Sequence, residues 1–344
     1  MAAEFESVCE DILWVKGNRE GIVPRSLSPK ALYQYFRHTY KLKTLIGQFA
    51  IDNKIDIIWT VNEAYLAGPL AAKFARIPNC SQVFGMTAFR TPVIGKLLAI
   101  FHKRYTFRII PCQDVIANEL DDLGYPNTQI NVVYNGVDVE KINSTVNKDI
   151  VTKSTEKSVG MVAGLDPRKG HLLFLNAASE VLKTVPDTKF YIIGNIEGND
   201  DYMAQIDACI DHLQLDKHVV KTGKVDNVYD YLTTLDVHCI PSKIEALSVA
   251  GLEAMALNKP VVATNVGGNH IAVKHGETGL LTKPEDSADL ASAIIQLLND
   301  NEKCIHFGNN GRRLIEELFT LEKSAAELHT IFSMCLEQSS STSE

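Results

Sequence analysis

The stretch Leu235–Gly268, LDVHCIPSKIEALSVAGLEAMALNKPVVATNVGG, alternates apolar runs with loop-forming and helix-forming residues. Val237–Ile240 and Val261–Thr264 are short apolar runs rich in β-branched residues, which predicts two buried strands. The residues over 248–257 favour a helix between them. The predicted order of strand, loop, helix and strand is one parallel crossover. Because ligands of open α/β sheets bind beyond the carboxyl ends of such strands, we expect a site at the loop over 241–247.

This loop and helix carry groups suited to two kinds of ligand atom. Ser248 is of the residue type preferred as an N-cap, and the free N–H groups at the helix start, around Val249, suit an anion such as a phosphate. Glu245 and Glu253 flank this anion site and would repel an anion, so they are better suited to accept hydrogen bonds from sugar hydroxyls. One molecule has a diphosphate with hydroxyl-rich groups on both sides, and that is a nucleotide-sugar. The bare pair of glutamates has about even odds of being only solvated charge on a helix.

The full string resembles the donor-site signature of retaining glycosyltransferases of the GT-B fold, glycosyltransferase family 4 especially. That signature is P-S-x-x-E, seven residues, E-A-M-A, then K-P-V-V-A-T and a Gly-Gly. The matching residues are Pro241, Ser242, Glu245, Glu253, Ala254, Met255, Ala256, Lys259, Pro260, Val261, Val262, Ala263, Thr264, Gly267 and Gly268. The resemblance implies that Glu245 orients the donor hexose and that Glu253 accepts hydrogen bonds from the ribose. It also places Ser242, Ser248 and Val249 at the donor site.

A second loop of the same kind spans Gly164–Gly170, where the family carries G-R-L, a few residues and K-G. Lys169 and Gly170 match, and the resemblance assigns Lys169 to the donor diphosphate. Gly164 stands where the family has arginine, and Arg168 is our candidate to supply the missing charge. In isolation, a basic pair in a loop is simply solvated about twice as often as it binds phosphate, but the strand before it and the helix after it reverse those odds. Gly223 lies within the segment over 219–231 that the resemblance places against the nucleobase.

Length and composition indicate a soluble two-domain protein. The chain has 344 residues, 45% of them apolar and 22% charged, and its net charge of −8 argues against a nucleic-acid partner. No run of eighteen apolar residues predicts a membrane span, and the N-terminus has no basic region typical of a signal peptide. Seven scattered cysteines without a C-x-x-C pair indicate free thiols. We therefore expect a cytoplasmic protein.

Strands and helices alternate along the chain, which predicts two Rossmann-like α/β domains facing each other across a cleft. We expect the first domain over 1–145 and the second over 155–344, with a polar linker over 143–158. The last predicted helix, Leu321–Glu337, is a candidate to cross back to the first domain, and the tail from Gln338 is expected to be disordered.

The first domain is expected to be incomplete. Its predicted helices cover 31–53, 64–76, 93–105 and 113–123, and its strands 55–61, 81–86, 108–111 and 131–134. An opening strand, its Gly-rich loop and the histidine that family members often carry after the middle strand are not evident. The second domain shows strands over 159–163, 189–194, 219–223, 237–240 and 261–264, with helices over 171–184, 201–213, 228–234, 248–257, 286–299, 304–318 and 321–337, and a turn over 275–279.

These patterns together predict a glycosyltransferase that moves a hexose from a UDP- or GDP-linked donor to a glycan or lipid-linked acceptor, with retention of the anomeric configuration. No metal and no further cofactor are expected, because the chain has no D-x-D sequence. A catalytically weakened binding or scaffold protein on the same fold is the first alternative. A dinucleotide-dependent oxidoreductase is disfavoured, since no G-x-G-x-x-G follows a predicted strand. The basic, apolar segment over 93–108 suggests peripheral contact with the inner membrane face, although an ordinary helix with solvated charges is about twice as common.

Overall fold

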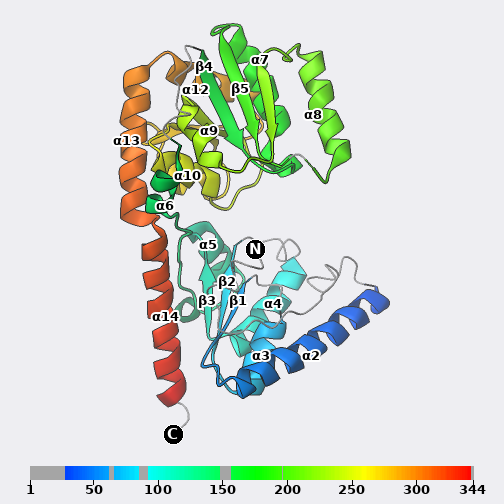
Figure 1. Cartoon of the computed structure of the whole chain (residues 1–344). Helices are drawn as coiled ribbons and strands as arrows, with labels where there is room; N and C mark the ends of the chain where they lie inside the picture. Colours follow the sequence, from blue (N-terminus) through cyan, green and yellow to red (C-terminus); the bar gives the residue numbers. More distant parts are fainter. Residues whose placement is uncertain (1–27, 62–65, 85–91, 148–155, 196, 342–344) are drawn as a thin grey trace. The chain divides into compact units, whose positions relative to one another are not determined.

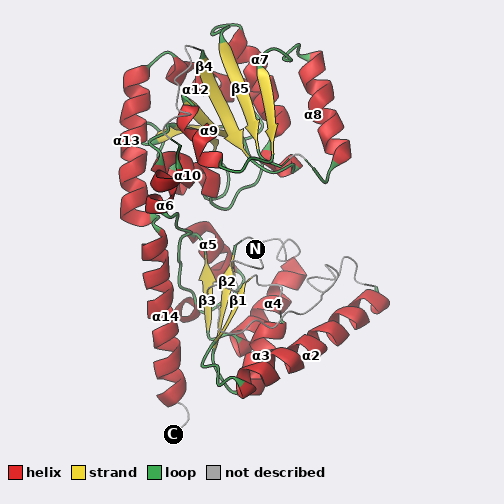
Figure 2. Ribbon diagram, viewed as in Figure 1, coloured by secondary structure: helices red, strands yellow, loops and turns green. Residues whose placement is uncertain are grey.

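The computed structural model describes residues 28–61, 66–84, 92–147, 156–195 and 197–341, and shows a mixed α/β chain with parallel sheets (Figures 1 and 2). The chain divides into two compact units. The first contains Met1–Val133 together with Leu328–Glu344, and the second contains Tyr134–Glu327. The second unit therefore includes residues 134–145, and the end of the C-terminal helix belongs to the first unit.

The second unit is built on a six-stranded parallel sheet with the order β6-β5-β4-β7-β8-β9. Its strands are β4 (Lys157–Val162), β5 (Thr188–Ile193), β6 (Val219–Gly223), β7 (Val237–Ile240), β8 (Val261–Thr264) and β9 (Gly279–Thr282). The sequence reading missed β9, because only a turn was expected at His275–Gly279. A turn does form, at Gly276, but the chain then pairs with β8 from Val261↔Gly279 to Thr264↔Thr282.

Helices cover both faces of this sheet (Figure 2). One core contains α7 (His171–Leu182), α8 (Asp200–His212) and α12 (Ser287–Leu298). The other contains α6 (Val139–Thr145), α9 (Val228–Thr234), α10 (Val249–Ala256), α11 (Asn269–Ala272) and α13 (Asn301–Leu318). Strand β7 contributes side chains to both cores, since Val237 and Cys239 belong to the first core and Ile240 to the second. Burial on both faces explains why β7 and β8 are continuous apolar runs in the sequence.

The first unit has a three-stranded parallel sheet among the described residues, in the order β1-β2-β3. Its elements are α2 (Pro29–Asp52), β1 (Ile58–Val61), α3 (Ala67–Ala75), β2 (Asn79–Val83), α4 (Pro92–Tyr105), β3 (Arg108–Pro111), α5 (Asp114–Asp122) and the short 3-10 helix η2 (Asn127–Gln129). Helix α14 (Leu321–Ser341) completes it, because Ile331 and Cys335 pack against Cys80, Ile110 and Val133. The expectation that an opening strand and its Gly-rich loop are missing falls on residues 1–27, which lie outside the described part of the chain.

Three predictions about local structure were wrong. The segment 131–134 is not a strand: it lies beside β3 through two hydrogen bonds, from Asn131 N to Ile109 O and from Val133 N to Pro111 O, and the ladder goes no further because β3 ends there. The tail is not disordered from Gln338, since α14 runs to Ser341 and the Gln338 Oε1 accepts a hydrogen bond from Arg108 (2.8 Å). The first residues of the expected linker, 143–145, are not a linker but the last residues of α6, a helix whose N-cap is Asp138.

Candidate donor site

Two glycines fix the loop between β7 and α10. Gly170 has φ +79°, and a Cβ built there would lie 1.8 Å from the Pro241 carbonyl oxygen. Gly267 has φ +50°, and its Cβ would lie 1.6 Å from the Glu245 carbonyl oxygen. Backbone therefore contacts both ends of the loop, at distances and dihedral angles that only glycine permits. This is a physical reason for the Lys-Gly and Gly-Gly pairs that the sequence pattern contains.

Three side chains meet at this loop. The ammonium of Lys169 lies 2.7 Å from the Glu245 Oε2, and the Ser242 hydroxyl donates to the same oxygen at 3.1 Å. Ser242 is buried, and its carbonyl accepts a 2.5 Å hydrogen bond from the Thr264 hydroxyl. The Glu245 side chain is 11% exposed and that of Lys169 35%. Lys169 therefore keeps two N–H donors for a ligand, while its position is fixed by Glu245, which Ser242 holds in turn.

Arg168 behaves differently from its neighbour. Its Nε and Nη2 donate to both carboxylate oxygens of Asp166, at 2.6 to 3.1 Å. These hydrogen bonds are the main reason why the pKa of Asp166 is lowered and that of Arg168 raised. The Arg168 carbonyl accepts from the Lys243 N–H at 2.7 Å, so the two loops are joined through backbone. The structure thus brings Lys169, Glu245 and Ser242 together and pairs the Arg168 guanidinium with a separate carboxylate.

The first turn of α10 leaves backbone donors open. The Ser248 hydroxyl accepts from the Gly251 N–H at 3.2 Å, and its carbonyl accepts from the Leu252 N–H at 3.0 Å. The N–H groups of Val249 and Ala250 are the ones with no intrahelical partner. They begin four residues after Glu245, at the carboxyl end of the strands. The positive end of the helix is therefore available to an anion.

Glu253 lies one turn further along α10 and is held by a tyrosine. The Tyr229 hydroxyl donates to the Glu253 Oε1 at 3.2 Å. Burial raises the pKa of Glu253, and the Tyr229 hydrogen bond opposes that rise. Burial and the nearby carboxylate raise the pKa of Tyr229 to about 12. The sequence analysis singled out Glu253 but not Tyr229. The sequence feature that could have pointed to Tyr229 is the N-cap residue Asn227, two residues before it, which marks the start of α9.

Gly164 follows β4 by two residues, and Gly223 is the last residue of β6. Nothing lies within 4 Å of a Cβ built at either position, so neither glycine is required by packing. Gly223 has φ +68°, whereas Gly164 is not in the left-handed region. Ile271, three residues after Gly268, is only 9% exposed and belongs to a hydrophobic core of the second unit.

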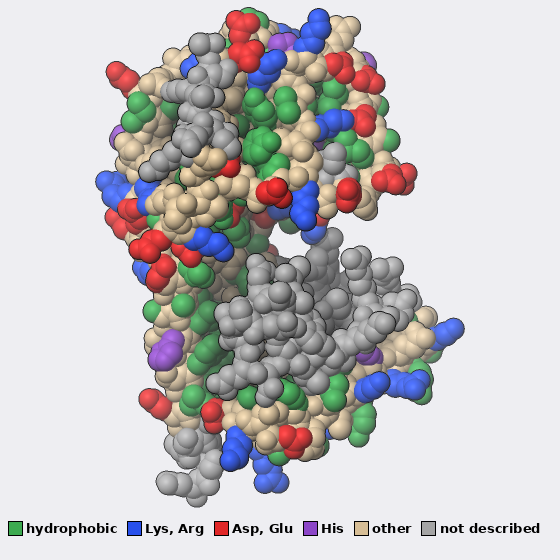
Figure 3. All heavy atoms as spheres, viewed as in Figure 1, with side chains coloured by type: hydrophobic (Ala, Val, Ile, Leu, Met, Phe, Trp, Pro, Cys, Tyr) green, Lys and Arg blue, Asp and Glu red, His purple; other side chains and the backbone are tan. Residues whose placement is uncertain are grey.

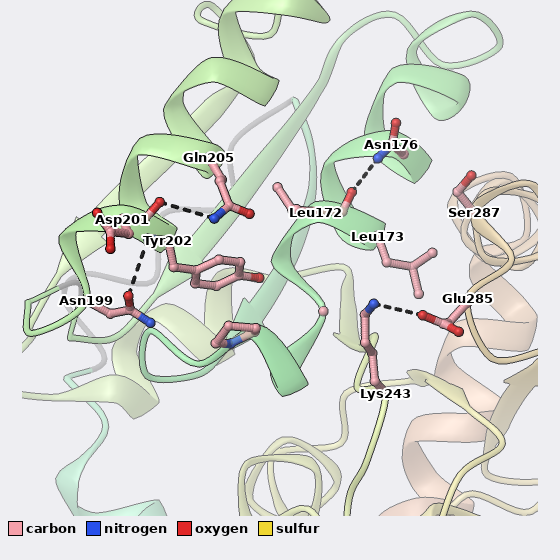
Figure 4. A pocket seen from close by; sticks show the side chains of 12 residues that line it. Leu172, Leu173, Asn176, Asn199, Asp201, Tyr202, Gln205, Lys243, Glu285 and Ser287 are labelled. Carbon is pink, nitrogen blue, oxygen red and sulfur yellow. Dashed lines mark hydrogen bonds and ion pairs between the residues drawn. The ribbon is translucent and has the colours of Figure 1, made fainter.

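A cavity of about 470 Å³ is lined by Gly170 and by residues of α7 and α8 (Figure 4). Its walls include Pro167, Tyr202 and the ion pair of Lys243 with Glu285 at 2.7 Å. Neither Lys169 nor Glu245 lines it. The cavity is therefore separate from the group around Glu245, although both share the loop that ends at Gly170.

The described residues contain no group of three or more His, Cys, Asp or Glu side chains placed to hold a metal ion. Among the same residues, no helix combines the length and the apolar character needed to cross a lipid bilayer.

Paired parallel α/β units with this loop geometry define the GT-B class, and the solved structures similar to this chain are glycosyltransferases of that fold. Residues 143–314 match the family model "Glycosyl transferases group 1", and residues 4–141 match "Glycosyltransferase Family 4". The chain belongs to the group 1 glycosyltransferases, family 4. The resemblance read from the sequence is confirmed.

Two curated relatives are similar over different lengths. The UDP-Gal:alpha-D-GlcNAc-diphosphoundecaprenol alpha-1,3-galactosyltransferase of Escherichia coli is 27% identical over 318 residues, which are 85% of this chain and 79% of the relative. The N-acetyl-alpha-D-glucosaminyl L-malate synthase of Bacillus anthracis is 28% identical over 221 residues, 63% of this chain and 57% of the relative.

Two solved structures share the fold. HepE of Anabaena in complex with UDP has a TM-score of 0.79 and 22% identity, with 86% of this chain and 82% of that chain covered. A glycosyltransferase from Rickettsia africae has a TM-score of 0.82 and 18% identity, with 97% and 87% covered.

Proposed function

We propose that the protein is a retaining hexosyltransferase that moves a hexose from a UDP- or GDP-linked donor to a hydroxyl of a glycan or lipid-linked acceptor. The observation that carries the proposal is the Lys169–Glu245 ion pair, which lies just before the open first turn of α10. These residues follow β4 and β7, which are neighbours in the sheet, so they lie at its carboxyl edge. Support comes from the family, from the UDP complex of HepE and from the galactosyltransferase of Escherichia coli.

In this proposal, Lys169 and the start of α10 bind the donor diphosphate. As the bond between sugar and phosphate breaks, negative charge grows on the departing diphosphate. Lys169 has two N–H donors left to meet that charge, and the N–H groups of Val249 and Ala250 add a second set. Donors already in place stabilise the transition state without rearrangement.

The two glutamates then bind the groups on either side of the diphosphate. Glu245 is fixed by Lys169 and Ser242, so its carboxylate is oriented to accept hydroxyls of the hexose. Glu253 uses one oxygen for Tyr229 and has the other for the ribose. Attack of the acceptor hydroxyl from the face that the diphosphate leaves would retain the configuration. The new glycosidic bond forms as the sugar–phosphate bond breaks, and the acceptor proton passes to the diphosphate.

A binding or scaffold protein on the same fold is the second candidate. The observation that favours it is the reduced charge at the diphosphate loop: Gly164 has no side chain, and Asp166 neutralises Arg168. Such a protein would bind a nucleotide-sugar without transferring or hydrolysing it. Assays of hydrolysis and transfer with UDP-glucose and GDP-mannose separate the two candidates.

We also propose a cytoplasmic location with peripheral membrane contact through the segment 93–108. Leu97 and Ile100 of α4 are 62% and 67% exposed, and Lys96 and Lys103 are exposed on the same helix. Apolar side chains between cations suit the interface of an anionic bilayer. A Leu97→Asp substitution that leaves vesicle binding unchanged would argue against this contact.

The test of the donor site is Glu253→Ala. We expect nucleotide-sugar binding, measured by calorimetry, to weaken by roughly 1.5–3 kcal/mol, because one charged hydrogen-bond acceptor is lost. Glu140→Ala is the matched control, since Glu140 is an exposed carboxylate of the same unit. Unchanged donor affinity in folded Glu253→Ala protein would refute the assignment of this residue.

A further inference from the structure

The first unit contains a cavity of about 620 Å³ that no part of the proposed reaction uses. It opens at the amino ends of β2 and β3, beside Asn79 and Arg108, which are the first residues of those strands. In Figure 1 this is the end opposite the arrowheads, towards the last turns of α14. Ligands of parallel sheets ordinarily bind at the carboxyl end, so this cavity lies at the opposite edge.

Four cations line the cavity and no carboxylate does. They are Lys73 of α3, Lys103 and Arg104 at the end of α4, and Arg108 at the start of β3. None of the four forms an ion pair within the described part of the chain. The chain as a whole carries a net charge of −8, and Figure 3 shows acidic and basic side chains interspersed over the second unit. The cavity is thus a local concentration of positive charge in an acidic protein.

Neutral groups hold two of these cations in place. Arg108 donates to the Phe107 carbonyl at 3.0 Å and to the Gln338 Oε1 at 2.8 Å. The Lys73 ammonium lies 4.6 Å from the centre of the Tyr105 ring. Carbonyls, amides and aromatic rings orient a cation without cancelling its charge. In the second unit the opposite holds, since Lys169 and Arg168 are each paired with a carboxylate.

We propose that this cavity is a binding site for a ligand with two or more phosphate groups. Cations converging on a cavity of this size focus the field on whatever enters it, and guanidinium and ammonium groups are the usual partners of phosphate oxygens. The volume exceeds that of a single phosphate and falls in the range of small-molecule sites. The ligand is a soluble polyphosphate or the phosphate headgroup of a lipid, and both present the same chemistry to the four cations.

Calorimetric titration of the full chain with pyrophosphate at low salt tests the proposal. The titration is made in a Lys169→Ala background, so that binding at the diphosphate loop does not obscure the result. The triple variant Lys73→Ala/Lys103→Ala/Arg104→Ala should bind pyrophosphate at least about tenfold more weakly. The matched control Lys30→Ala/Arg37→Ala/Lys41→Ala removes the same charge from exposed positions of α2 and should change the affinity less than about twofold.

Vesicles distinguish the two sources of the ligand. The full chain is sedimented with phosphatidylcholine vesicles that contain or lack cardiolipin, a lipid with two phosphate groups. Retention by cardiolipin that is lost in the triple variant identifies a lipid headgroup, and pyrophosphate binding without retention identifies a soluble ligand. The single variant Arg104→Ala, which disturbs the fold least, should already weaken binding about threefold. If neither pyrophosphate binding nor retention differs between the triple variant and the α2 control, the proposal is wrong. This result would leave the donor site of the second unit untouched.

Discussion

The two sheets of the molecule reach their stability in different ways. The second sheet has six strands, and its strands, helices and both cores come from one continuous segment, 134–327. The first has three strands among the described residues, and β2 buries Asn79, Ser81 and Gln82 at its centre. Its apolar contacts with Ile331 and Cys335 come from the far end of the chain. The second unit therefore depends on contacts that are closer in sequence, and the first depends on a helix that belongs to both units.

Removing residues 328–344 should have the largest effect. The deletion uncovers Cys80, Ile110 and Val133, and the lost burial of Ile331 and Cys335 should cost the first unit on the order of 4 kcal/mol. We expect limited proteolysis to digest this unit first and to leave a resistant fragment that starts within 143–158. Glu337→Ala, an exposed substitution in the same helix, is the control and should behave as wild type. If the first unit of the deletion variant resists protease as well as that of the wild type, the first unit does not depend on α14 for its stability.

Acid should act on the second unit through His238, which is fully buried in β7. Burial lowers the pKa of His238 from 6.5 to about 4, and both ring nitrogens lack a hydrogen-bond partner among the described residues. Between these two pKa values the unfolded chain binds a proton that the folded chain does not. Stability therefore falls as the pH drops from 6.5 towards 4, by about 3 kcal/mol at pH 4.

The variant His238→Leu should lose this part of the acid sensitivity. Thermal unfolding of wild type and variant between pH 7 and pH 4 measures the difference. Parallel pH profiles for the two proteins would show that His238 takes up no proton on unfolding.

Within the second unit, Lys169 and Arg168 should differ. Lys169→Ala should weaken donor binding by roughly 1.5–3 kcal/mol, because it removes a charged donor and frees Glu245. Arg168→Ala should cost less than about 1 kcal/mol, since Asp166 already neutralises the guanidinium and the pair is largely exposed. Calorimetry with UDP measures both. Equal losses would mean that Arg168 leaves Asp166 when the donor binds and supplies the charge missing at Gly164, the role that the sequence analysis gave to Arg168.

The smallest expected effect is a gain in donor affinity. Gly164→Arg places a guanidinium where the family carries one, in open space and outside the left-handed region. We expect donor affinity to improve by about 1 kcal/mol and stability to change by less than about 0.5 kcal/mol. Gly164→Gln, of similar length but without charge, should bind the donor as wild type does. An improvement in both variants would point to packing rather than charge.

The sequence predicted the second unit far better than the first for a physical reason. Five of its six strands were found, and β7 and β8, which are buried along their whole length, stand out most clearly as apolar runs, whereas β6 is partly exposed. The short β9 was missed because its Gly279–Thr282 run follows a turn directly. In the first unit, the polar start of β2 placed the predicted strand too late, at 81–86 instead of Asn79–Val83, since Asn79 is buried by hydrogen bonds to Ile58 O and Thr60 Oγ1 rather than by apolar contacts.

In the candidate site, too, the sequence pattern identified residues, whereas some of their side-chain partners are known only from the structure. Glu245, Lys169 and Ser242 belong to a string of residue types, and the structure brings them within hydrogen-bond distance. The pairing of Arg168 with Asp166 and of Glu253 with Tyr229 depends on side-chain direction, which spacing along the chain does not reveal.

The shared helix α14 also sets an order of events on the ribosome. Leu328 is synthesised 195 residues after Val133, because the whole second unit lies between them. At typical elongation rates this takes about 10–40 s, during which Cys80, Ile110 and Val133 of the nascent first unit lack their contacts with Ile331 and Cys335. The second unit has its complete set of strands before that helix emerges. Domains usually fold in the order of their synthesis, but here the unit made first is the last to be completed, so its uncovered sheet is the part of the nascent chain that a chaperone would bind.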